Sequence, residues 1–391
     1  MRRGVVILLY VALLVGEMSW SAVAPLLPSF AARFSLSDSK AGVILSVASL
    51  AILLVSIPAG AITRRIGARW LTVSSALMMT LGNIAIGTAS SYGSLLVGRA
   101  LFGLGLGMLW VGGTSWLHDV AGEDRTKALS MTLAVIGAGS LVGPAFAGLV
   151  GERFGLGAPF LVLAVASLVV ALVLFLQPSG GMHAAQEHEP SFGEMVRAAG
   201  SDDMIRGSVA LMLIGSLLWL TVYLLIPLRL DADGWSAANI GVAFSVSSVL
   251  YAGVSWVVAR RADRWATLGV AAAATAGLAA SLVVVVASAS VGAAVTFLML
   301  AGITTAVMIS LTFPLGVAGP RHVSVALVGG LLNVAWAISG LIGPTLGGVA
   351  TQRIGDRATF SLLAIITSGA ALWMVAVRRR LRRSVHERAR T

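Results

Sequence analysis

Residues 137–148 read Gly-Ala-Gly-Ser-Leu-Val-Gly-Pro-Ala-Phe-Ala-Gly, and the Gly143-Pro144 pair within them recurs 200 positions later as Gly343-Pro344. Neighbouring residues recur at the same displacement or at one position less. The matched residues are Gly148 and Gly348, Arg153 and Arg353, Gly155 and Gly355, Phe160 and Phe360, Gly42-Val43 and Gly241-Val242, Ser46-Val47 and Ser245-Val246, and Ser49 and Ser248. Two blocks that repeat at almost one displacement indicate that the chain contains two homologous halves.

The composition indicates which solvent surrounds these halves. Of the 391 residues, 58% are hydrophobic and 11% are charged, whereas a soluble domain carries about 25% charged residues. So few charges leave too little polar surface to cover a water-soluble globule of this length. We therefore expect a lipid bilayer to surround the chain.

A helix needs about 20 apolar residues to cross about 30 Å of hydrocarbon, and the sequence contains twelve such runs. Their approximate ranges are 5–28, 41–62, 70–89, 93–117, 128–150, 159–176, 206–228, 239–259, 266–287, 291–314, 322–349 and 358–377. Each half holds six runs, an even number, so both halves enter the membrane in the same orientation. The sequence predicts an all-α membrane protein of 12 transmembrane helices in two pseudo-symmetric six-helix bundles. We expect an N-terminal bundle at 1–176, a cytoplasmic linker at 177–205, a C-terminal bundle at 206–380 and a basic cytoplasmic tail at 381–391.

The basic residues alternate between the two sides of the membrane. Twenty of the 27 Lys and Arg residues fall in the even-numbered loops and the two tails, six fall in the odd-numbered loops, and Arg99 lies inside an apolar run. Because basic residues are enriched in cytoplasmic loops, both termini are predicted to be cytoplasmic in an inner (cell) membrane. The net charge of +11 thus reflects topology and contact with anionic lipid, and we expect no nucleic-acid partner.

Two cytoplasmic loops carry related motifs. The loop after the second run reads Gly60-Ala-Ile-Thr-Arg-Arg-Ile-Gly67-Ala-Arg69, and the corresponding loop of the second half ends in Asp263-Arg264. Their basic side chains, that of Arg65 among them, can simply anchor the loops at an anionic membrane surface.

The fourth and fifth runs carry glycine motifs. The fourth opens with Arg99-Ala-Leu-Phe-Gly-Leu-Gly-Leu-Gly, and glycines four residues apart let another helix approach closely. In the fifth, Gly139 and Gly143 form a groove, and Pro144 removes one helix hydrogen bond, which favours bending or tight packing against the other half.

These motifs resemble those of the major facilitator superfamily, and the Gly-Pro motif resembles that of its 12-helix drug/proton antiporter branch. The resemblance extends over nearly the whole chain and includes Asn333-Val-Ala-Trp336 before the second Gly-Pro pair. One position differs, because the acid usual in this family's loop is replaced by Arg64. The resemblance implies alternating access between two halves. It also implies conformational roles for Gly60, Arg65, Gly67, Arg69, Gly139, Gly143, Pro144, Asp263, Arg264, Asn333, Gly343 and Pro344.

Glu17 is the one acid near the middle of an apolar run. A carboxylate there costs about 2.5–3.5 kcal/mol on insertion scales, so it needs a proton, a partner or water. Arg99 is its expected partner, since the first and fourth helices both line the central cavity in this fold. Three interpretations stay open: proton coupling through Glu17 and Arg99, a fixed ion pair, and direct contact of Glu17 with a cationic substrate.

The substrate cavity is expected on the first, fourth, seventh and tenth runs. Tyr10, Glu17 and Ser21 form a polar stripe at helical spacing on the first run. Aromatic, methionine and threonine side chains suit an amphipathic organic molecule, although a lone Trp more often anchors or packs a helix. The candidate cavity residues are Tyr10, Trp20, Ser21, Met108, Trp110, Trp219, Tyr223, Thr304, Met308 and Thr312.

Taken together, the sequence predicts a secondary active transporter that exports a hydrophobic or amphipathic compound by proton exchange. A facilitator or proton symporter for a sugar, amino acid or organic acid is the alternative, and a membrane sensor or scaffold is the alternative from another class. There is no cysteine, the histidines show no ligand spacing and no catalytic constellation is visible. We therefore expect no enzyme activity, no metal and no cofactor, and a monomer whose partners are its solute, protons and lipid.

Overall fold

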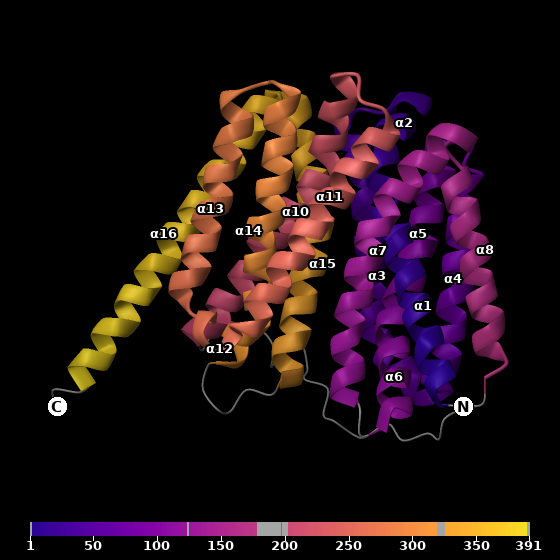
Figure 1. The fold of residues 1–391 in the computed structure, drawn as a ribbon, viewed down its shortest axis with the longest axis horizontal. Helices are drawn as coiled ribbons and strands as arrows, with labels where there is room; N and C mark the ends of the chain where they lie inside the picture. The colour runs from indigo at the N-terminus through magenta and orange to yellow at the C-terminus, as the bar shows by residue number, and fades with distance from the viewer. Residues whose placement is uncertain (1, 123–124, 178–196, 198–201, 319–324, 389–391) are drawn as a thin grey trace. The chain divides into compact units, whose positions relative to one another are not determined.

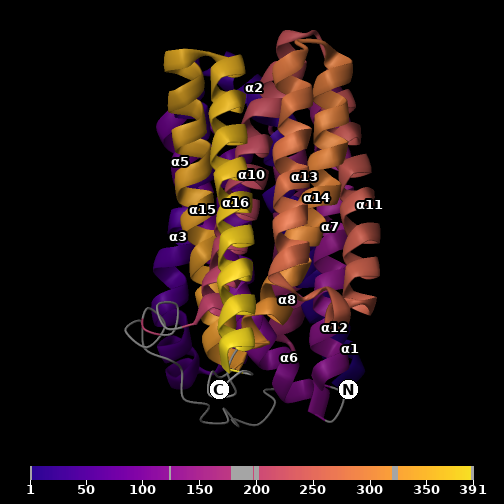
Figure 2. The same cartoon turned by 90° about the vertical axis from the view of Figure 1, so that its left-hand side faces the viewer.

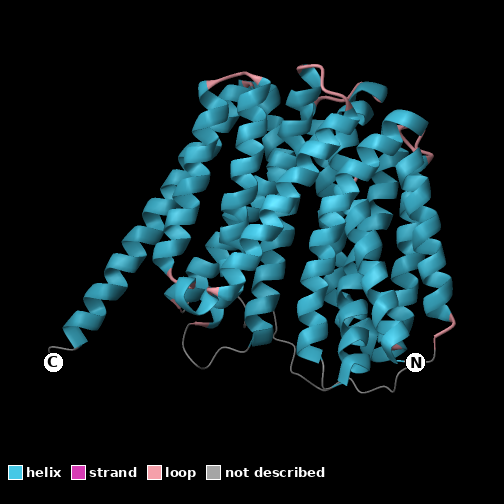
Figure 3. Ribbon diagram, in the orientation of Figure 1, coloured by secondary structure: helices cyan, strands magenta, loops and turns pink. Residues whose placement is uncertain are grey.

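The computed structural model describes residues 2–122, 125–177, 197, 202–318 and 325–388, and these residues form helices and short turns without a strand (Figure 1, Figure 3). The elements are α1 Arg2–Ser21, α2 Val23–Arg33, α3 Asp38–Ile66, α4 Ala68–Gly87, α5 Tyr92–Met108, the π-helix η1 Leu109–Gly113, α6 Thr114–Ala121, α7 Arg125–Phe154, α8 Ala158–Phe175, α10 Asp203–Ala232, α11 Ala237–Arg260, α12 Ala262–Trp265, α13 Leu268–Ala287, α14 Val291–Val317, α15 Val325–Ile354 and α16 Asp356–Arg388. The all-α fold class is confirmed.

Twelve helical segments are long and apolar enough to cross a membrane, which confirms the predicted number. Two predicted runs are divided: the first contains α1 and α2, and the fourth contains α5, η1 and α6. The fifth and eleventh helices run past their predicted ends, to residues 154 and 354. Each stops where Gly155 or Gly355 takes a positive φ, of 96° and 80°, a conformation open to glycine. A helix can therefore continue for several residues beyond the end of its apolar run.

The chain groups into two compact units that do not follow the sequence halves. Unit 1 contains Met1–Gln186, Tyr223–Ser248 and Pro344–Val349, and unit 2 contains Glu187–Val222, Val249–Gly343 and Ala350–Thr391. In unit 1, α7 packs on α1, and α5 and α8 pack on α4 (Figure 1). In unit 2, α13 packs against both α14 and α16 (Figure 2). Residues 178–196 and 198–201 of the predicted linker at 177–205 lie outside the described residues, and α10 begins before the predicted end of the linker, at Asp203. At the other end of the chain, α16 continues as backbone helix into the predicted tail.

Glycines set the distance between α1 and α7. A Cβ at Gly139 would lie 2.7 Å from Glu17 Cβ, and a Cβ at Gly143 would lie 2.8 Å from the carbonyl oxygen of Met18. No side chain fits in that space, so the two helices touch through their backbones. The second repeat does the same in unit 2, where a Cβ at Gly343 would lie 2.9 Å from Leu217 O on α10. This close approach brings Glu17 within reach of the side chains of α7.

Candidate functional site

The site is built around Glu17 on α1. Its side chain is half-buried, and Oε1 accepts a hydrogen bond of 2.6 Å from Ser140 Oγ on α7. This length is at the short end of the 2.5–3.0 Å range of O–H···O hydrogen bonds. Every other acid with a described side chain lies at a helix end or in a turn, whereas the apolar run that contains Glu17 continues into α2. Glu17 is therefore the acid that the described spans hold deepest in apolar surroundings.

Arg99 is not the partner of Glu17. Its side chain is fully buried on α5, and its Nε donates to Ile44 O at 3.0 Å. Among the described residues, its two Nη atoms have no hydrogen-bond partner. The guanidinium carbon lies 5.5 Å from the ring centroids of both Trp20 and Phe102, a cation–π arrangement that offsets part of the cost of burial. The expected pair is not formed because Glu17 faces α7, while Trp20 from the same helix contacts Arg99.

The polar stripe on α1 also faces α7. Tyr10 donates to Ala128 O at 2.9 Å, and Ser21 Oγ lies 2.8 Å from Glu17 O and 3.5 Å from Gly139 O. The three residues therefore share one face, as their spacing predicted. That face contacts a neighbouring helix along its length, and Glu17 is its half-buried acid.

Besides Tyr10 and Ser21, four candidate cavity residues belong to unit 1. Trp20 and Tyr223 are buried, and Tyr223 packs edge-to-face with Phe244 at a centroid distance of 5.1 Å. Met108 is half-buried at the end of α5, and Trp110 is 36% exposed in η1.

The other four belong to unit 2. Trp219 is half-buried and lies 5.9 Å from Tyr251 between ring centroids. Met308 and Thr312 are buried in α14, whereas Thr304 donates to Leu300 O of its own helix at 2.8 Å. Helix packing accounts for these three side chains of α14, and their contact with a substrate stays a prediction.

The loop motifs occupy helix ends. Gly67 joins α3 to α4 with a φ of 86°, and Arg69 donates to Phe175 O while its guanidinium stacks 4.9 Å from the Trp70 ring centroid. Gly60 is buried in α3, whereas the side chains of Arg65, Arg264 and Asn333 are exposed. Asp263 lies on α12, and its side chain is outside the described residues. The conformational roles of these residues stay predictions.

The repeat motif places α7 against α11 and α15 against α3. The carbonyl of Pro144 lies against Gly241, Ala145 N donates to Ser245 Oγ at 3.1 Å, and Ala238 N donates to Glu152 Oε2 at 3.1 Å. In the corresponding contact, the carbonyl of Pro344 lies against Gly42, and Thr345 Oγ1 donates to Ser46 Oγ at 2.8 Å. Residues that match between the repeats thus form both contacts within unit 1.

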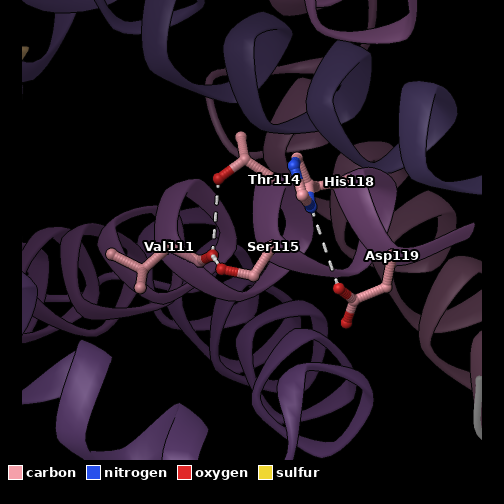
Figure 4. A network of polar contacts seen from close by, with 5 residues as sticks. All are labelled: Val111, Thr114, Ser115, His118 and Asp119. Carbon is pink, nitrogen blue, oxygen red and sulfur yellow. Dashed lines mark hydrogen bonds and ion pairs between the residues drawn. The ribbon is translucent and has the colours of Figure 1, made fainter. Parts of the chain in front are cut away.

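Two features were missed in the sequence. The first is η1, which contains Trp110 and leads directly into α6. Figure 4 shows polar contacts of these two segments: Ser115 Oγ donates to Val111 O at 2.7 Å, and His118 Nδ1 lies 3.9 Å from Asp119 Oδ1. The Gly112-Gly113 pair was its available signal. The second is Ser140, four residues before Pro144, whose side chain binds Glu17.

The chain is similar in sequence to known transporters. Residues 9–327 match the sequence model of the Major Facilitator Superfamily. The chain is 27% identical over 324 residues to the synaptic vesicular amine transporter of Rattus norvegicus, which covers 78% of this chain and 60% of that protein. It is 32% identical over 183 residues to the probable vesicular acetylcholine transporter-B of Danio rerio, which covers 44% of this chain and 37% of that protein. The chain thus spans 60% or less of the length of these two relatives.

Solved structures share the fold. A bacterial homolog to the human lysosomal transporter Spinster, in an inward-facing and occupied conformation, gives a TM-score of 0.82 at 13% identity and covers 97% of each chain. The inward-facing and unoccupied form of that homolog gives 0.74 at 15% identity, over 96% of this chain and 94% of that one. At such identity the likeness concerns the fold alone.

Proposed function

The chain belongs to the Major Facilitator Superfamily, and the relatives and solved structures that it matches are named as transporters. We propose that it exports an amphipathic organic amine in exchange for protons by alternating access. The bundles at 1–176 and 206–380 would move around a central site, joined by 177–205. The charge distribution along the loops supports a location in the cell membrane with both termini in the cytoplasm.

The observation that carries this proposal is Glu17. An ionised carboxylate in apolar surroundings is costly, at about 2.5–3.5 kcal/mol on insertion scales, so Glu17 favours an occupant of positive charge. A proton and an ammonium group both satisfy this need, and one carboxylate holds one of them at a time. Competition for Glu17 therefore converts the entry of a proton into the release of an amine.

The relatives support the amine as substrate class. Two families of curated proteins that match this chain are named as amine and acetylcholine transporters. Both names describe organic cations with an apolar part, which fits an acid in apolar surroundings. Among the candidate cavity residues of unit 1, Trp20 and Tyr223 would supply aromatic surface for the rest of the molecule.

The free energy for export comes from the proton gradient. Exchange of one proton for one singly charged amine moves no net charge, so the pH difference alone drives it. Each pH unit is a tenfold difference in proton concentration, or about 1.4 kcal/mol, and supports a tenfold gradient of the amine. A second proton in each cycle would add the membrane potential, which supplies about 2.3 kcal/mol for one charge at 100 mV.

The test is uptake into proteoliposomes with an acidic interior. The probe is N,N,N-trimethyltryptammonium, a permanent cation that does not equilibrate by deprotonation, and tryptophol is its neutral counterpart. We expect the acidic interior to stimulate uptake of the cation by the wild-type protein and not by Glu17→Gln, because Gln binds neither occupant by charge. Asp203→Asn is the matched control, since Asp203 pairs with Arg206 at a helix start. Gradient-driven uptake by Glu17→Gln would rule out coupling through this residue.

A symporter or facilitator for an organic acid is the second candidate. The two Nη atoms of Arg99 lack hydrogen-bond partners in the described structure, and a carboxylate matches such a fork. This candidate would be favoured if the flux of an organic acid such as benzoate is lost on substitution of Arg99 and unchanged on substitution of Glu17.

A further inference from the structure

We propose that Ser140 is a positioning residue that connects the ionised state of Glu17 to the contact between α7 and α11. The inference rests on the proposed exchange of a proton for an amine at Glu17. In it, an empty and ionised Glu17 keeps the α7–α11 contact closed, and either occupant releases it.

Pro144 frees the backbone acceptor that this connection uses. In a helix the carbonyl of residue i−4 accepts from the N–H of residue i, and proline has no N–H. The carbonyl of Ser140 therefore has no such partner within α7. Ser248 Oγ on α11 lies 3.1 Å from this oxygen and donates to it. A proline in one helix thus gives a backbone acceptor to another helix.

The side chain of Ser140 binds α1, whereas the carbonyl of the same residue binds α11. Its hydroxyl donates to Glu17 Oε1 at 2.6 Å, so one residue contacts the acid of α1 and the hydroxyl of α11. Hydrogen bonds to a charged group contribute about 1.5–3 kcal/mol. The bond to ionised Glu17 therefore holds this turn of α7 in place.

Both bonds can be exchanged without leaving a hydroxyl unpaired. Ser248 Oγ also lies 3.0 Å from Phe244 O of its own helix, to which its single proton can turn when the contact opens. An ammonium group bound to Glu17 competes for the carboxylate oxygens, and protonation of Glu17 removes the anionic acceptor of the Ser140 hydroxyl. It can then bond the carbonyl of Ile136, four residues earlier, a pattern that bends helices. Bending concentrates at this turn because Pro144 has already removed one hydrogen bond there.

No other charged side chain competes for Glu17 in the described structure. On α1 itself, Tyr10 bonds Ala128 O. The elements that pack on α1 carry their described charged or titratable groups at their ends: Arg33 on α2, Arg69 on α4, His118 and Asp119 on α6, and Glu152 and Arg153 on α7. The π-helix η1 and α8 carry none, and Arg99 is bonded to Ile44. A change in the charge of Glu17 therefore acts first on Ser140.

The second repeat lacks this connection. At the displacement of 200, Glu17 corresponds to Leu217 and Ser140 to Gly340, so neither the acid nor the hydroxyl recurs. Ser49, the counterpart of Ser248, is buried, and its Oγ has no hydrogen-bond partner in the part of the chain that the structure describes. Ser49→Ala is therefore a matched control for Ser248→Ala, because both remove a buried hydroxyl at the same place in the repeat.

The first test measures slip, the movement of an empty carrier. Vesicles loaded with N,N,N-trimethyltryptammonium are diluted at pH 8 into buffer with or without the same probe. Wild-type protein is expected to release probe mainly by exchange. Ser140→Ala is expected to raise release without exchange by about tenfold, the change that loss of a charge-assisted bond produces. Ser140→Thr, which keeps the hydroxyl, and Ser49→Ala are expected to behave as wild type, and Ser248→Ala as Ser140→Ala.

The second test measures the contact itself and needs no substrate. The chain has no cysteine, so Phe154→Cys and Asp233→Cys, both at exposed positions of unit 1, give two unique spin-label sites. Distances by electron–electron double resonance are expected to lengthen as the pH falls in the parent. They are expected to be long at all pH values in Glu17→Gln, and to lose their pH dependence in Ser140→Ala and Ser248→Ala.

The outcomes separate the two proposals. Gradient-driven transport by Glu17→Gln would overturn the proposed function together with this inference. If Glu17→Gln abolishes that transport while Ser140→Ala and Ser248→Ala keep both tight exchange and pH-dependent distances, the inference alone fails. Should Ser140→Ala not fold, Ser248→Ala carries both tests, since it leaves the bond between Ser140 and Glu17 in place.

Discussion

Arg99 shows how a buried charge can be held with no counter-ion among the described side chains. One backbone carbonyl and the faces of two aromatic rings surround the guanidinium, and two of its nitrogens stay without hydrogen-bond partners. Such a group contributes little to stability, because desolvation of a charge costs several kcal/mol and incomplete pairing does not recover it. A role of Arg99 in the transport cycle stays a prediction.

Two substitutions of Arg99 separate folding from that role. Arg99→Met removes the buried charge and keeps the volume, so the free energy of unfolding is expected to stay within about 1 kcal/mol of wild type or to rise. Arg99→Lys keeps the charge but loses the fixed Nε geometry and the planar stacking, so it is expected to lower that free energy by about 1–3 kcal/mol. Denaturant unfolding in detergent micelles, followed by tryptophan fluorescence, measures both. An Arg99→Met protein far less stable than Arg99→Lys would contradict this account.

At the scale of the helix, α7 contains glycines of opposite character. Gly139 and Gly143 face α1 with no room for a methyl group, whereas a Cβ at Gly137 would meet no atom within 4 Å. The difference follows from helical position, since residues four apart share a face and a residue two positions away does not.

Alanine substitutions in α7 should therefore have opposite signs. Gly143→Ala is expected to lower the free energy of unfolding by about 1–3 kcal/mol, because the methyl group forces α1 and α7 apart. Gly137→Ala is expected to raise it by about 0.5–1 kcal/mol, because alanine restricts the unfolded chain and favours the helix. The midpoint of thermal unfolding compares the two proteins under one condition. Equal effects of the two substitutions would argue against the observed packing of α7 on α1.

The helices themselves could be predicted, and their side-chain partners could not. An apolar run of about 20 residues has few alternatives to a spanning helix, because lipid offers no partner for backbone polar groups. The partner of Arg99 depends on how α1 and α5 are rotated about their axes, which composition does not determine. Ser140 was likewise overlooked, because its importance comes from the missing N–H of Pro144 and from Ser248, which is more than 100 residues away. The π-helix at Leu109–Gly113 is equally invisible to a count of apolar residues.

At the scale of the whole molecule, the twelve predicted spans and the distribution of basic residues require that alternate turns lie on opposite sides of the membrane. Ser35 lies in the turn between α2 and α3, and Ala289 lies between α13 and α14. Gly122 lies in the turn after α6, on the side predicted to be cytoplasmic together with both termini.

Single cysteines in the cysteine-free chain test this topology. A membrane-impermeant maleimide added to intact cells is expected to label Ser35→Cys and Ala289→Cys, and to label Gly122→Cys only after the membrane is opened. Expression level and labelling after lysis serve as controls for each protein. Labelling of Gly122→Cys from outside, with protection of the other two, would reverse the orientation while leaving the fold intact.

The two Gly-carbonyl contacts have a consequence for how such a protein diversifies. Pro144 and Pro344 meet Gly241 and Gly42 through main-chain atoms, so the closest approach in each of these two seams is made by the backbone. Selection on cargo can then alter the aromatic and polar groups elsewhere in the bundle while the seams remain intact. A duplicated ancestor with this property could acquire new cargoes by a few substitutions and keep both backbone contacts.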